Sequence, residues 1–165
     1  MSQNDKRIRE RQANFRQTNA FAMQHGMILG LWAVACQAFY VLGLSSPLFS
    51  NLWLLTLLAI PAITILLTLR LRKIVGNDVS FPFSRGFVHA ILTVMYASVW
   101  AAVATFVYMH FFDNGYVFDY FIEAFSRPEM QKAMKESGLE ENIRNSTGGM
   151  TVIDFINGLR TFGAA

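Results

Sequence analysis

Charged side chains are scarce in this sequence, and their scarcity decides the broad class of protein. Asp, Glu, Lys and Arg make up 15% of the 165 residues, whereas a soluble domain has about 25%. So few charges cannot cover a soluble fold with polar surface. Aromatic residues reach 14%, which excludes a disordered tail because disordered segments contain few of them.

The sequence has a single cysteine and none of the common catalytic motifs. The single cysteine, Cys36, lies in an apolar run, so it cannot form an internal disulfide, and a disulfide-stapled secreted domain is excluded. The sequence has no glycine-rich phosphate loop, no zinc-protease motif and no G-x-S-x-G elbow. We therefore expect no enzymatic activity, no cofactor and no bound metal.

Long apolar runs are what the sequence does contain. Hydrophobic residues make up 53% of the chain and gather in three runs, Met27–Leu44, Leu52–Leu69 and Phe87–Phe112. A helix of about 18 residues is about 27 Å long, close to the ~30 Å hydrocarbon core of a bilayer. The predicted fold class is therefore all-α, an integral membrane helical bundle with three transmembrane helices. No span has Asp, Glu, Lys or Arg in its interior, which argues against an ion-coupled transporter.

The positive charges lie beside these spans. The net charge is +3 and the pI is near 9.2, yet residues 1–20 and 70–86 each balance at +3 and residues 113–165 at −3. This distribution is typical of membrane topology rather than of nucleic-acid binding. By the positive-inside rule the N-terminus and the second loop are cytoplasmic, and the first loop is outside.

Three segments follow from this topology. We expect a basic cytoplasmic tail over 1–20, a three-span bundle over 21–112 and an extracytoplasmic amphipathic helical segment over 113–165. The basic tail, with Phe15, Phe21 and Met23, either forms a helix on the anionic inner leaflet or only fixes the orientation of the chain.

The last segment is predicted to contain several short helices. Ser126 and Glu129 have capping-box spacing around Pro128, so a helix should start there and stop near Gly138. A polar, glycine-bearing break over 145–149 precedes a second cap, Thr151 with Asp154. The final stretch of about fifteen residues is too short to span the bilayer.

Small and polar residues inside the spans are the candidate packing sites. Gly26 and Gly30, continued by Gln37, form one stripe, and Ala97 and Ala101 form another. Such stripes let helix backbones approach closely in lipid, either between two copies of the chain or between the first and third spans of one copy. Gln37 should hydrogen-bond another helix or, alternatively, line a substrate path.

Proline and histidine are the remaining unusual residues in the spans. Pro61 should kink the second span because it removes a backbone hydrogen bond. His25 and His89 lie at the cytoplasmic ends of the first and third spans, where packing of the two helices would bring them together. Paired imidazoles can ligate haem or a metal, or relay protons; the alternative is that both are interfacial histidines.

Four short motifs resemble those of a family of small, uncharacterised bacterial membrane proteins known as a domain of unknown function. They are Gly26–Leu31, Arg70–Lys73, Ser80–Phe87 and Tyr108–Tyr116. The resemblance implies an inner-membrane location and, usually, a fourth span. This sequence ends at Phe162–Ala165, where such a span would begin, so either the last helix is lost or the chain is truncated.

These observations give two hypotheses for function. We favour a non-enzymatic structural or accessory subunit of a membrane assembly, with the bilayer and a membrane-protein partner or a second copy as its contacts. The alternative is a small permease or channel that is active as an oligomer.

Overall fold

The computed structural model describes residues 2–75 and 81–163. The described residues are 88% helical and contain no strand. Three helices are long and apolar enough to cross a membrane: α1 (Gln3–Gly43), α2 (Pro47–Val75) and α3 (Phe83–Phe111). The predicted all-α fold class with three such helices is therefore confirmed. Residues 76–80 of the basic second loop, which include the first residue of the Ser80–Phe87 motif, and the last two residues of the sequence lie outside the described residues.

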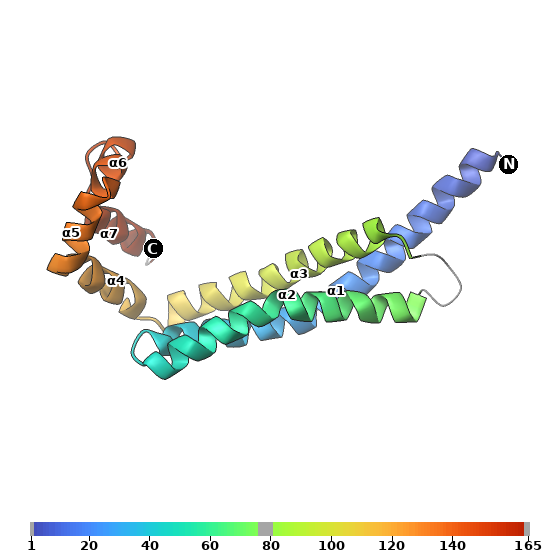
Figure 1. The fold of residues 1–165 in the computed structure, drawn as a ribbon, viewed down its shortest axis with the longest axis horizontal. Helices are drawn as coiled ribbons and strands as arrows, with labels where there is room; N and C mark the ends of the chain where they lie inside the picture. Colours follow the sequence, from blue (N-terminus) through green and yellow to red (C-terminus); the bar gives the residue numbers. More distant parts are fainter. Residues whose placement is uncertain (1, 76–80, 164–165) are drawn as a thin grey trace. The chain divides into compact units, whose positions relative to one another are not determined.

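The chain divides into two compact units, residues 1–105 and 106–165. The first unit contains α1, α2 and nearly all of α3, whose axes run side by side in Figure 1. The second unit contains the end of α3 and four short helices: α4 (Tyr116–Ser126), α5 (Pro128–Glu136), α6 (Leu139–Ser146) and α7 (Val152–Gly163).

Helix α1 is a single helix of 41 residues, which at 1.5 Å per residue is about 60 Å long. It starts at a capping box. The backbone N–H of Ser2 donates to the Asp5 carboxylate, and the backbone N–H of Asn4 donates to the Ser2 hydroxyl. No proline follows before Gly43 to interrupt it. The basic residues before the first span therefore belong to α1 and do not form a separate helix. The first turns of α1 extend past the ends of α2 and α3 (Figure 1).

The core of the first unit is small. Leu29 of α1, Leu67 of α2 and Ala97 of α3 are buried against one another, with Ile60 and Ile63 packed at the edge. Pro61 lies inside α2 and is exposed, and α2 continues as a single helix before and after it. Most of the other large apolar side chains are exposed, which suits helices whose outer faces contact lipid.

The turn between α3 and α4 depends on the Asp113–Gly115 tripeptide. Asn114 and Gly115 have φ of +47° and +86°, a backbone conformation that asparagine and glycine adopt most readily. Both carboxylate oxygens of the buried Asp113 accept the backbone N–H of Val117, at 3.2 and 3.3 Å. This carboxylate thus satisfies a free donor in the first turn of α4.

Two details of the short helices differ from the sequence prediction. Helix α5 begins at Pro128 as expected, but its N-cap residue is Arg127, whose side chain makes no capping hydrogen bond. The Ser126 hydroxyl, expected to cap α5, instead donates to Ile122 O of α4 at 2.6 Å. The start is set by proline at the first helical position. Helix α6 also continues through Asn145 and Ser146, so the break before α7 begins two residues later than predicted.

Candidate functional site

The strongest polar feature of the first unit is a buried pair of histidines. Nδ1 of His25 on α1 lies 3.0 Å from Nε2 of His89 on α3. His89 is fully buried and His25 nearly so. The opposite side of the His89 ring reaches α2, because its Nδ1 lies 3.0 Å from Oγ1 of Thr68. One imidazole therefore connects all three long helices.

The direction of these hydrogen bonds is fixed by the backbone carbonyl of Thr64, which can only accept. The Thr68 hydroxyl donates its only proton to the carbonyl oxygen of Thr64, at 2.9 Å, so its oxygen must accept from Nδ1–H of His89. Neutral His89 then has a bare Nε2, which accepts Nδ1–H from His25. The four groups form a one-way chain from His25 through His89 and Thr68 to Thr64.

This chain uses the histidines as partners for each other. The two facing nitrogens are occupied, so in this arrangement they cannot also coordinate an ion. No group of three or more His, Cys, Asp or Glu that could hold a metal occurs in residues 2–75 and 81–163. The geometry provides a connection between helices, and each buried donor and acceptor in this hydrogen-bond chain has a partner.

The small-residue stripes lie at one interface between α1 and α3 of the same chain. A side chain at Gly26 would collide with Cβ of Tyr96, and one at Gly30 would approach Trp100 to 2.8 Å. Ala97, buried beside Gly26, completes this close contact. Glycine is therefore needed at both α1 positions for α3 to approach.

Gln37 continues the same interface about two turns further along α1. Its amide nitrogen donates to Ala101 O at 3.2 Å and to Thr105 Oγ1 at 2.7 Å, both on α3. The candidate residues Gly26, Gly30, Gln37, Ala97 and Ala101 are thus brought together by the structure. Pro61, on α2, lies apart from them.

A third polar cluster, at the other end of α3, was not expected from the sequence. Arg85 donates from Nε to Thr18 Oγ1 at 3.0 Å, from Nη1 to Asn14 Oδ1 at 3.4 Å and from Nη2 to Gln17 Oε1 at 2.7 Å. The three acceptors lie on one face of α1, since they are three and four residues apart. That polar spacing is the only signal of the cluster in the sequence, in which Arg85 is one of the basic residues that give the segment 70–86 its +3 charge.

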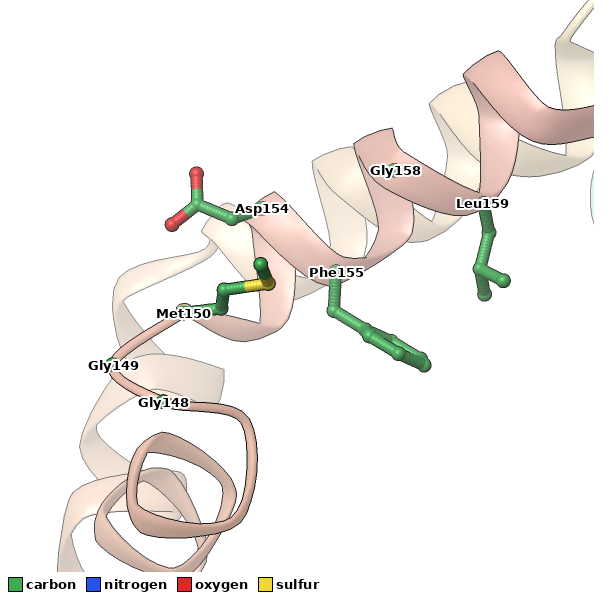
Figure 2. Close-up of a pocket in the computed structure, with 7 residues that line it drawn as sticks. All are labelled: Gly148, Gly149, Met150, Asp154, Phe155, Gly158 and Leu159. Atoms are coloured by element: carbon green, nitrogen blue, oxygen red, sulfur yellow. The ribbon is translucent and has the colours of Figure 1, made fainter.

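The second unit contains an open pocket of about 560 Å³ beside α7. Figure 2 shows the side chains of Phe155 and Leu159 on the same side of α7, with Asp154 directed away from them. Three glycines and Met150 complete the lining. The pocket is an apolar surface patch whose single acidic group is bonded to Thr151 at 2.7 Å.

Helix α7 is tied to α4 and capped as the sequence predicted. Thr151 and Asp154 form the expected reciprocal cap: Thr151 N donates to Asp154 Oδ2 at 3.0 Å, and Asp154 N donates to Thr151 Oγ1 at 3.2 Å. These bonds to the Thr151 side chain and backbone lower the pKa of the Asp154 carboxyl below its usual range. Arg160 of α7 bonds Asp119 of α4 at 2.7 Å.

Comparison with known proteins identifies a family. A family model described as a protein of unknown function (DUF4199) matches residues 24–161. This range includes the His25–His89 pair, the contacts of Gly26, Gly30 and Gln37 with α3, and all but the last two residues of the four short helices. Asn14, Gln17 and Thr18, the acceptors of Arg85, lie before it. No curated protein and no solved structure matches the chain.

Proposed function

The chain belongs to the DUF4199 family, and from that premise we propose that it is a non-enzymatic structural or accessory subunit of a membrane assembly. We further propose that it spans the bacterial inner membrane three times with its N-terminus in the cytoplasm. The basic residues at the start of α1, and Arg70, Arg72 and Lys73 at the end of α2, support this orientation.

One observation carries the proposal: the polar groups within the long helices are used to join those helices. His25, His89 and Gln37 all bond across helix interfaces. Groups engaged in this way hold a bundle together, whereas catalysis or ion coupling requires a polar group that is available to a substrate.

The outer faces of the same helices are left for a partner. In each long helix, only 11–22% of an apolar 18-residue stretch is buried within the chain. On α2, Leu55, Leu58 and Leu66 are each about two-thirds exposed. An exposed apolar face of this kind contacts either lipid or a helix of another membrane protein.

Photocrosslinking in native membranes tests the proposal. A photoreactive residue at Leu58, which is 64% exposed, should crosslink to one reproducible partner protein, and the partner should co-purify in mild detergent. The matched control is Leu67 on the same helix, which is 8% exposed and should give no such adduct. Adducts with lipid alone, together with a monomer that retains no protein, would show that the proposal is wrong.

The alternative, a permease or channel formed by several copies, has less support. Gln37 is bonded to α3 of its own chain, and the Gly26 and Gly30 surfaces are filled by the same helix. A crosslink from Leu58 to a second copy would favour this alternative. Flux through liposomes that changes in Gln37→Leu would then establish it.

A further inference from the structure

We propose that a cleft between α1 and the start of α3 binds the phosphate of an anionic phospholipid headgroup. The cleft has a volume of about 450 Å³. Two arginines, Arg11 of α1 and Arg85 of α3, line it together with the hydroxyl-bearing Ser84 and the apolar Phe15 and Val88. A lining that combines two cations with hydroxyl and apolar side chains matches the chemistry of a lipid at the level of its headgroup and glycerol.

The charge of Arg85 is held in place but not neutralised. Its three acceptors, on Asn14, Gln17 and Thr18, are all uncharged oxygens. Among the described residues no carboxylate forms an ion pair with it. The guanidinium has five N–H donors, so these bonds leave two for a ligand, and a partly buried cation favours an anion there.

Arg11 supplies a second cation that has no competing partner among the described residues. It lies on the exposed side of α1, and no hydrogen bond or ion pair of its guanidinium occurs within the described residues. Two guanidinium groups at one cleft suit a phosphate, which guanidinium binds in a planar, bidentate manner.

The cleft lies at the start of the predicted third span. Arg85 lies two residues before the predicted start of the third span at Phe87, which is the depth of the headgroups. With the proposed orientation this is the cytoplasmic leaflet, the one that carries anionic lipid and attracts basic residues. The inference therefore rests on the proposed orientation but not on the proposed partner protein.

Native mass spectrometry of the full chain in mixed micelles tests the site. The protein is titrated with phosphatidylglycerol, with phosphatidylcholine and with inorganic phosphate, and the bound species are counted. Arg11→Gln should lower the apparent affinity for phosphatidylglycerol about fivefold, and Arg85→Gln should lower it further. Arg16→Gln is the matched control, since Arg16 lies on the same helix, is exposed and does not line the cleft.

Each result has a definite meaning. A selective loss of phosphatidylglycerol in Arg11→Gln, with phosphatidylcholine unaffected, supports the site. An equal loss in Arg16→Gln would show diffuse attraction to the membrane and overturn the proposal. Displacement of the lipid by millimolar inorganic phosphate would assign the cleft to a free anion instead. Because Arg11 forms no hydrogen bond or ion pair within the described residues, its variant reports on binding even if Arg85→Gln loosens α1 from α3.

Discussion

His25 and His89, 64 positions apart in the chain, meet with their facing nitrogens 3.0 Å apart and their ring planes at 88°. The edge-on arrangement directs the Nδ1–H of one ring at the lone pair of the other. Because Thr68 fixes the proton on Nδ1 of His89, the contact has a single direction. The pair thus joins α1 to α3 and, through Thr68, to α2.

Removing the last hydroxyl of this chain should weaken the bundle. Thr68→Val leaves the Nδ1–H of buried His89 without an acceptor, so the free energy of unfolding in micelles should fall by about 1–2 kcal/mol. Thr56→Val is the control, because the Thr56 hydroxyl bonds only Trp53 O of its own helix, and it should cost less than about 0.5 kcal/mol. Equal losses would contradict the directional chain. ¹⁵N chemical shifts should also report the Nδ1–H tautomer of His89.

A methyl group at Gly26 should separate α1 from α3. In Gly26→Ala the added Cβ meets Cβ of Tyr96 and the carbonyl oxygen of Thr93, atoms that cannot move without the backbone of α3. We expect a loss of about 1–3 kcal/mol of stability. Gly158→Ala, where nothing lies within 4 Å, should be neutral or stabilise α7 by up to ~1 kcal/mol. Similar thermal stability of both variants would show that α3 does not pack closely here.

The hydrogen bond from Gln37 to Thr105 should appear as a coupling energy. A double-mutant cycle with Gln37→Leu and Thr105→Val removes the 2.7 Å contact from each side, and interhelical bonds of this kind average about 0.6 kcal/mol in membranes. We expect a coupling of about 0.5–1.5 kcal/mol. A cycle of Gln37→Leu with Ser98→Ala, whose hydroxyl bonds only Met95 O, should give a value near zero. A zero value in both cycles would indicate that Gln37 points elsewhere.

The start of α7 should lose stability in acid. The bonds from Thr151 hold the pKa of Asp154 below its unfolded value, so the cap stabilises the helix above that unfolded pKa. Its contribution decreases as the pH falls through the lowered, folded-state pKa. Amide hydrogen exchange at the first turn of α7 should therefore accelerate at low pH relative to the last turn, after correction for intrinsic rates. Asp154→Asn should remove this difference in pH dependence.

Several parts of the fold could be predicted from local sequence alone. The three apolar runs, the cap formed by Thr151 and Asp154 and the start of α5 at Pro128 depend on residues that are close in the chain. Cap partners lie only three residues apart, and the cost of transferring backbone to lipid makes each apolar run helical. The failures were also local: Ser126 had an equally near acceptor in Ile122 O, and spacing does not say which acceptor a hydroxyl prefers.

What the sequence by itself determined is therefore the class of protein: all-helical, with three helices apolar enough to span a membrane. Only the tertiary structure decided which polar groups meet. The partner of His89 on α2, the acceptors of Arg85 on α1 and the close approach of Tyr96 to Gly26 each join residues more than twenty positions apart. Such contacts depend on the rotation of each helix about its axis and on its register along its neighbour, and packing alone fixes these.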